Sequence, residues 1–339
     1  MTVTPPSTQP SLITCVGEPL VVLTAERGPL EFAETFARGP GGAELNVATT
    51  IASLGLPTAL ITRVGTEGFG HYIVDHLVAS GVDVSAVVVD LVRQTGLYVK
   101  QRGAGTDHPH DLGDTESRWL YYRRDSAASA LSVGDLAYPS VQDVLRRTQL
   151  LHVTGITPAL SETARQTVDQ LLRGNYLRSF DVNYRPGLWT SPELAADTLA
   201  GCVRASDIAF MGLDEANAAF NTATPAEIRA TFPEPEYLVV KNDAHHVTAF
   251  HKGDAIEVPS LTVDVHEKIG AGDAFASGFL VGIITGESVA RALRLGHICA
   301  ATTLTTAADA VAPSRSVIER LIALPDEQWR TTQFDPANP

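Results

Sequence analysis

The stretch "KIGAGDAFASGFL" at residues 268–280 holds the side chains best suited to chemistry. Asp273 follows three small residues, Gly270, Ala271 and Gly272, and leads into an apolar run typical of a buried helix. The first N–H groups of a helix lack partners and carry partial positive charge, so they suit an anion that glycine lets approach closely. A helix cap alone needs one residue, and a carboxylate in an anion site repels the anion. We therefore interpret Asp273 as a base facing a hydroxyl that attacks a phosphate.

Two arginines stand where an acidic chain could use them to hold an anion. The formal net charge is −14 over 339 residues, which argues against nucleic acid or an anionic membrane surface as a partner. Arg123 follows two tyrosines in a strand-like segment, and Arg185 follows the run "DVNY". A guanidinium fork matches a carboxylate, whereas a neutral polar ligand can be held by amides and hydroxyls. The two arginines therefore favour a substrate that carries a carboxylate.

Each arginine also has a second interpretation. Arg123 or its neighbour Arg124 could be an ordinary exposed strand charge, and strand alternation lets only one of them face a site. Arg185 could hold a substrate carboxylate or the transferred phosphate, and the sequence leaves those two roles open.

Four short apolar runs separated by longer segments of helical period would position these residues. The runs are "LHVTGI" (151–156), "SFDVNY" (179–184), "IAFMGL" (208–213) and "YLVVKN" (237–242). This alternation is typical of a parallel sheet with crossover helices, and the carboxyl ends of its strands share the edge where ligands bind.

The N-terminal third predicts a small separate sheet that could serve as a lid. Its strand-like segments are "PLVVLTA" (19–25), "TGLYVKQ" (95–101) and "RWLYYRR" (118–124). Between the last two, residues 102–117 are rich in Gly, Asp and His and predict a mobile loop. His108 and His110 could be metal ligands there, but a solvated loop is the favoured interpretation.

Composition fits an α/β enzyme that we expect to be cytoplasmic. The chain is 44% hydrophobic, and its most apolar window, "FLVGIITG", is too short to cross a bilayer. The three cysteines lie far apart, show no metal or redox spacing and are expected in the core. Neither the dinucleotide fingerprint nor the Walker phosphate loop occurs, which argues against a dehydrogenase.

Taken in order, five motifs resemble the ribokinase-like (PfkB) carbohydrate kinases over nearly the whole chain. They are "GGAELN" (41–46), "RVGTEGFG" (63–70), "TGLY" (95–98), "DVNYR" (181–185) and "GAGDAFASG" (270–278). The resemblance implies a three-layer α/β/α sandwich with a mainly parallel central sheet and a small β-sheet lid. It also implies ATP and Mg2+ as cofactors, Asp273 as catalytic base, and an anion hole at Gly270, Ala271 and Gly272.

Within that family, further segments resemble the 2-keto-3-deoxygluconate kinases. These are "GEPLV" (17–21), "YYRRDSAASAL" (121–131), "GITPALS" (155–161) and "DVNYRPGLW" (181–189). The resemblance implies ATP-dependent phosphorylation of the terminal 6-hydroxyl, giving 2-keto-3-deoxy-6-phosphogluconate. The implied substrate contacts are Gly41, Gly42, Asn46, Tyr98, Tyr121, Arg123, Ile156, Arg185 and Asp309. Lys241, Asn242, Gly270 and Gly272 are the implied nucleotide contacts, and Glu215 is the implied magnesium-linked carboxylate.

On the nucleotide side the chain departs from the family pattern. Glu267 stands where an Asp is usual, and Gly212 replaces the Asn of the motif that ends in Glu215. The usual glycine-rich turn reads "KNDAHHV" (241–247) here, and Asn and Asp tolerate left-handed backbone better than most residues.

The expected organisation is one kinase domain at residues 11–325, flanked by flexible tails at 1–10 and 326–339. Lid segments at about 18–40 and 92–126 are inserted in it, and an open lid face would favour a homo-oligomer. Three alternatives to the implied function remain: a fructokinase-like enzyme, a kinase for a different keto-deoxy sugar acid, and a catalytically silent sugar-acid sensor.

Overall fold

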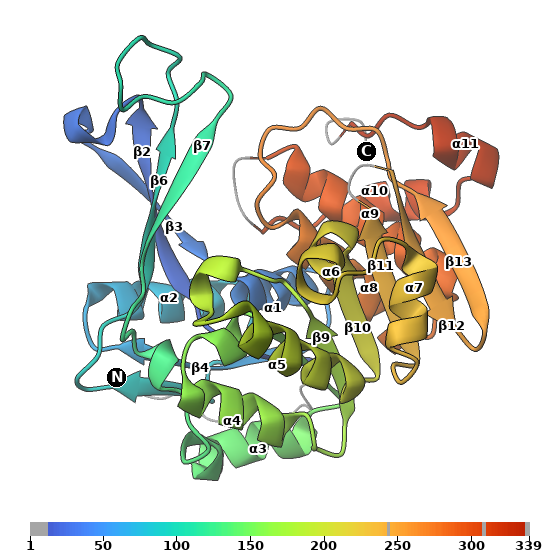
Figure 1. Ribbon diagram of the computed structural model, residues 1–339, viewed down its shortest axis with the longest axis horizontal. Helices are drawn as coiled ribbons and strands as arrows, with labels where there is room; N and C mark the ends of the chain where they lie inside the picture. Colours follow the sequence, from blue (N-terminus) through green and yellow to red (C-terminus); the bar gives the residue numbers. More distant parts are fainter. Residues whose placement is uncertain (1–12, 243–244, 307–309, 336–339) are drawn as a thin grey trace.

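The computed structural model describes residues 13–242, 245–306 and 310–335, and within them it has three layers, α/β/α, with a second sheet standing apart (Figure 1). The main sheet has the strand order β13-β12-β11-β10-β9-β8-β1-β4-β5. Its strands are β1 (Ile13–Val16), β4 (Thr58–Gly65), β5 (Val87–Asp90), β8 (Leu150–Thr154), β9 (Leu177–Asp181), β10 (Ile208–Gly212), β11 (Tyr237–Asn242), β12 (His246–His251) and β13 (Asp254–Pro259). The seven strands from β11 to β5 pair in parallel, which confirms the predicted sheet.

Helices cover both faces of this sheet and form two apolar cores. One face carries α1 (Ala43–Ser53), α2 (Gly68–Ala79), α8 (Ala271–Ile284), α9 (Val289–Leu304), α10 (Arg315–Ile322) and α11 (Asp326–Thr331). The other carries α3 (Pro139–Arg147), α4 (Glu162–Leu171), α5 (Pro192–Arg204), α6 (Leu213–Phe220) and α7 (Pro225–Thr231). Cys15, Cys202 and Cys299 are buried in these cores, as expected. Among the described residues, no helix is long and apolar enough to cross a membrane.

The second sheet is the predicted lid, and its four strands run in the order β3-β2-β6-β7. They are β2 (Leu20–Arg27), β3 (Phe36–Gly41), β6 (Leu97–Arg102) and β7 (Ser117–Tyr122). Three were predicted as strands, but β3 was not, because its sequence "FARGPG" reads as a turn. An edge strand tolerates Pro40, since one side of its backbone needs no partner.

The loop between β6 and β7 has no helix or strand over residues 103–116. The Asp111 side chain accepts backbone N–H bonds from Ala104, Thr106 and Leu112. In the same loop, His110 Nδ1 lies 2.6 Å from Glu31 Oε1, so this imidazole pairs with a carboxylate from the β2–β3 connection.

At the C-terminus the structure corrects the prediction of a flexible tail from residue 326. Residues 326–331 form α11, and Trp329 is buried with its indole N–H donating to Pro259 O at 2.8 Å. The Arg294 guanidinium lies over the Trp329 ring, 4.8 Å from its centroid. One aromatic residue in a short polar segment thus supplies enough buried surface to anchor the segment. The predicted tail at 1–10 and residues 336–339 lie outside the described residues.

Helices α8 and α9 pack with their backbones in close contact. A Cβ on Gly278 would lie 2.5 Å from Leu295 O, and a Cβ on Gly282 would lie 2.8 Å from Ala292 Cα. On the facing helix, a Cβ on Gly296 would lie 2.9 Å from Phe275 O. Glycine at these three positions allows α8 to lie this close to its neighbour. Asp273 stands in the first turn of α8.

Candidate active site

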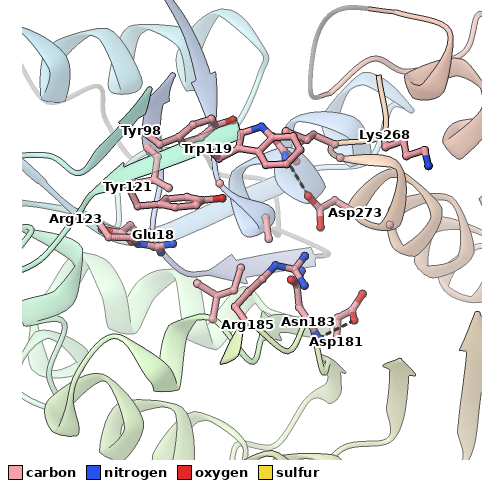
Figure 2. Close-up of a pocket in the computed structure, with 18 of the residues that line it drawn as sticks. Glu18, Tyr98, Trp119, Tyr121, Arg123, Asp181, Asn183, Arg185, Lys268 and Asp273 are labelled. Carbon is pink, nitrogen blue, oxygen red and sulfur yellow. Dashed lines mark hydrogen bonds and ion pairs between the residues drawn. The ribbon is translucent and has the colours of Figure 1, made fainter. Parts of the chain in front are cut away.

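A cavity of about 350 Å³ lies between the lid sheet and the carboxyl edge of the main sheet (Figure 2). The lid contributes Leu20, Tyr98, Trp119, Tyr121 and Arg123, next to Glu18. The main body contributes Gly42, Ala43, Asn46, Ile156, Asp181, Asn183, Arg185, Glu215, Lys241, Lys268, Ile269, Gly270, Gly272 and Asp273. Most of the predicted site residues therefore share one cavity. Gly41 and Ala271 are adjacent to it without lining it, and Asp309 lies outside the described residues.

Asp273 is buried in the first turn of α8 and faces the cavity (Figure 2). Gly270, with φ of 78°, is the N-cap, so a left-handed residue turns the chain into the helix. Asn46 donates to Asp273 Oδ2 at 2.9 Å. Burial, together with the nearby carboxylates of Asp181 and Glu44, raises the pKa of Asp273 to about 7, against the opposing effects of Asn46 and Lys241. A carboxylate with such a pKa is suited to general-base catalysis near neutral pH.

Lys241, near the end of β11, supplies a half-buried positive charge that lines the cavity. Its ammonium lies 2.8 Å from Asp181 Oδ2. Burial opposes the charge, but Asp181, Glu215 and Asp273 together raise the pKa of Lys241, so it stays protonated. A Cβ on Gly272 would lie 3.6 Å from this ammonium, which places the lysine beside the helix start that was predicted to bind an anion.

Arg123 already has a carboxylate partner within the protein. Its Nε donates to Glu18 Oε2 at 2.6 Å, and its side chain is 10% exposed while that of Glu18 is fully buried. Tyr121 lies on the same wall as predicted, and its ring packs against Tyr98 with centroids 5.2 Å apart. The guanidinium therefore lines the cavity as half of an ion pair, and any substrate carboxylate would be a second partner for it.

Arg185 and Glu215 form an ion pair on the part of the cavity wall that the main body supplies. Arg185 Nη1 lies 3.2 Å from Glu215 Oε1, and the other carboxylate oxygen accepts from Gly212 N at 2.9 Å, which caps α6. Burial and the charge of Asp181 raise the pKa of Glu215 despite Lys241 nearby. Glu215 is thus a half-buried carboxylate that lines the cavity, and its link to magnesium stays a prediction.

Two cavity-lining amides keep an unused acceptor. Within the part of the chain that the structure describes, neither Asn46 Oδ1 nor Asn183 Oδ1 has a hydrogen-bond partner, although both are buried. Asn183 also has a positive φ of 37° at the end of β9. Buried polar atoms normally find partners, so these two oxygens fit a ligand rich in hydroxyl groups.

A second cavity of about 340 Å³ adjoins the first through Lys241. Its other lining residues are Leu213, Asp214, Asn217, Ala223 and Asn242. The predicted nucleotide-side residues Lys241 and Asn242 thus lie together, next to the start of α6.

Comparison with known proteins decides the family. Residues 11–314 match the sequence pattern of the pfkB family carbohydrate kinases. This chain is a pfkB-family carbohydrate kinase.

Three similar proteins illustrate the similarity of this kinase to known proteins in sequence and in structure. It is 34% identical to the 2-dehydro-3-deoxygluconokinase of Thermoproteus tenax over 292 residues, covering 84% of this chain and 85% of the relative. A PfkB protein from Polaromonas sp. JS666 is 31% identical, with a TM-score of 0.76 over 88% of this chain and 97% of that chain. The sugar kinase PH1459 from Pyrococcus horikoshii, solved in complex with ATP, is 25% identical, with a TM-score of 0.75 over 88% and 94% of the two chains.

The kinase cavity also holds residues that were not among the predicted site residues, notably Glu18, Asp181, Asn183 and Trp119. Asp181 and Asn183 stand in the motif "DVNYR" at a strand end, so their position alone could have indicated them. Trp119 stands two positions before Tyr121 on the same strand, so strand alternation places both side chains on one face of the sheet. Glu18 stands in the segment "GEPLV", but its pairing could not be predicted, because its partner Arg123 lies 105 residues away.

Proposed function

We propose that this carbohydrate kinase transfers the γ-phosphoryl group of ATP to the 6-hydroxyl of 2-keto-3-deoxygluconate. The observation that carries the proposal is Asp273, a buried carboxylate with a pKa raised to about 7, at the N-terminus of α8 beside a positive-φ glycine. A silent sensor has no need for a base of this kind.

Three features support a sugar acid as the acceptor. Arg123 lines the cavity from the lid and Arg185 lines it from the main body, and two unpartnered amide oxygens suit hydroxyl groups. Tyr98, Tyr121 and Trp119 offer apolar ring faces for the carbon chain. The similarity to the Thermoproteus tenax 2-dehydro-3-deoxygluconokinase points the same way.

In the proposed mechanism, the residues of this chain position and deprotonate the acceptor. Asp273 accepts the proton of the attacking hydroxyl, while Asn46 holds its carboxylate in place. The first N–H groups of α8 at Ala271, Gly272 and Asp273, together with Lys241, stabilise negative charge on the transferring group. The lid aromatics cover the acceptor and exclude water.

ATP and magnesium fit the residues on the main-sheet side. We propose Lys241, Asn242, Gly270 and Gly272 as nucleotide contacts, and a relative was solved with ATP. Magnesium prefers carboxylate and water oxygens, and Glu215 supplies a half-buried carboxylate next to Asp181. When bound near Glu215, the ion would supply positive charge that offsets the negative charge of the phosphate groups.

Glu215→Gln should raise the magnesium concentration needed for half-maximal rate by roughly three- to tenfold, because a neutral amide orders metal-bound water less well. Glutamine can still accept from Gly212 N, so α6 stays capped. Steady-state rates over a magnesium series measure the effect, with Asp197→Asn on the exposed side of α5 as the matched control. An unchanged magnesium requirement would remove Glu215 from the metal assignment.

The rate should also depend on the ionisation of Asp273. Because a base must be deprotonated to act, kcat/KM for the acceptor should rise with pH and level off above an apparent pKa near 7. The profile is measured from about pH 5.5 to about pH 9 with saturating nucleotide and magnesium. A flat profile over that range would contradict the raised pKa or the role as base.

The direct test of the proposed function is an ADP-release assay with a panel of acceptors. It should include 2-keto-3-deoxygluconate, its galactonate epimer, fructose and ribose. We expect the gluconate acid to give the highest kcat/KM. A neutral ketose at the top would favour the fructokinase-like alternative, and binding of the acid without ADP release would favour the sensor.

We also propose that the kinase assembles as a homo-oligomer through its lid. Phe36 on β3 and Tyr122 on β7 are exposed, and they extend an open sheet surface that another copy could cover.

A further inference from the structure

An ion pair joins the lid to the segment that precedes the anion-binding turn. Lys100 on strand β6 and Glu267 are 167 residues apart in sequence, and the lysine ammonium contacts Glu267 Oε2. Their side chains are only 8% and 13% exposed. Such a pair is poorly screened, and parting it would leave a largely buried charge without this partner, so the contact holds its two segments together.

The other oxygen of Glu267 shapes the turn itself. Oε1 accepts from the backbone N of Lys268 at 2.9 Å and of Ile269 at 3.4 Å. The backbone N of Glu267 in turn donates to Leu304 O at the end of α9, at 3.2 Å. One carboxylate therefore contacts the lid with one oxygen and, with the other, fixes the two amides that lead into Gly270.

Lys100 shares a strand face with an acceptor-side residue. Tyr98 and Lys100 are two positions apart on β6, so their side chains leave the same face of the sheet. Tyr98 lines the cavity, whereas Lys100 does not line it and contacts Glu267, which precedes the turn. Movement of this strand relative to the main sheet would therefore shift both the cavity wall and the support of the turn.

We propose that Lys100 is a positioning residue that couples the lid to the anion-binding turn. When the lid lies over the acceptor, Lys100 holds Glu267, and Glu267 sets the backbone of residues 268–270 so that the start of α8 faces the phosphoryl group. When the lid lifts, the pair parts and the turn loses that support. Binding of the phosphoryl group is thereby linked to the position of the lid over the acceptor, and this link limits phosphoryl transfer to water. The inference rests on the proposed phosphoryl transfer at Asp273.

The test compares Lys100→Met with Glu267→Gln in the full chain. Glutamine keeps an acceptor for the Lys268 and Ile269 amides but removes the charge that pairs with lysine. Each change should lower kcat by about tenfold with less than about a threefold change in acceptor KM, since the turn is misplaced and the acceptor pocket is kept. The double variant should be no slower than either single variant, because both remove the same contact.

Two further variants sharpen the result. Glu267→Asp keeps the charge but shortens the side chain by one methylene, so it should resemble Lys100→Met. Arg118→Met removes an exposed cation from the adjacent lid strand β7 and should behave as the parent. Any acceptor that the parent phosphorylates can be used for these rates.

A structural measurement needs no turnover at all. Amide hydrogen exchange over residues 268–273 should be faster in Lys100→Met and Glu267→Gln than in the parent and in Arg118→Met, without substrate present. Parent-like exchange and parent-like kcat in both variants would overturn the coupling, as would additive losses in the double variant. Absence of kinase activity in the parent would instead count against the proposed function, while the exchange result still decides the coupling.

Discussion

Asp273→Asn is expected to lower kcat by roughly two to four decades, the usual span for loss of a general base. The variant keeps the hydrogen-bonding shape of the side chain, so Asn46 can still contact it and both substrates should bind. The loss should appear in kcat with little change in the dissociation constants of acid and nucleotide, measured by calorimetry. Turnover near the parent value would remove Asp273 from its role as base.

The same variant has a stability signature that an aspartate with an ordinary pKa would not give. The folded pKa of Asp273 is about 7 against 3.8 for the unperturbed group, so the folded state holds a proton that the unfolded state has released. Parent stability should therefore fall as pH rises from about 4 to about 7, by at most about 4 kcal/mol. Asp273→Asn should unfold at higher urea than the parent at pH 8 and at similar urea at about pH 4. A less stable variant at pH 8 would contradict the raised pKa.

Arg123→Met should lower kcat/KM for 2-keto-3-deoxygluconate by roughly one to two decades and change that for fructose little. A charge-assisted hydrogen bond to a carboxylate contributes about 1.5–3 kcal/mol, and methionine keeps much of the stem while removing the fork. The parent should prefer the acid strongly. Equal losses on both acceptors, or a parent that phosphorylates fructose as well as the acid, would favour a neutral-sugar kinase.

The ion pair with Glu18 supplies the control for that experiment. Arg123→Met alone leaves the buried Glu18 carboxylate without its partner, which costs stability and repels an acidic substrate. Arg123→Met/Glu18→Gln removes that repulsion, so its loss of acid preference should be smaller than that of the single variant and still clear. If the double variant regains the full preference, Arg123 serves only to neutralise Glu18. Arg185 is a poorer probe, because a phosphate contact would slow every acceptor alike.

The sequence was sufficient for the parallel sheet and the lid, and most of the candidate site residues that it indicated line one cavity. Apolar runs report burial directly, and the carboxyl ends of parallel strands must share an edge, so the strand pattern alone brings Arg185 and Lys241 together. Two of the small elements that it missed, β3 and α11, have local reasons. The Gly and Pro of β3 resemble a turn, and α11 depends on burial of one residue, Trp329.

Pairings between distant charges could not be predicted. Nothing in the segment around Arg123 indicates Glu18 as its partner, and nothing around Glu267 indicates Lys100. Each pair joins segments more than a hundred residues apart, and its formation depends on the three-dimensional position of the lid. These contacts determine the charge around each arginine. Predicting which substrate the arginines favour therefore requires the structure as well as the motif.

The glycine-lined contact between α8 and α9 has a consequence for how new activities could arise in this molecule. Gly278 and Gly296 leave no room for even one added methyl group, so the helix that carries Asp273 accepts few substitutions. The cavity wall on the lid side, in contrast, is built from Tyr98, Trp119 and Tyr121 on a separate sheet. These three side chains can vary without disturbing the helix pair. Directed evolution toward another sugar should therefore succeed from libraries at these three positions, with Lys100 kept, and fail from libraries in α8 and α9.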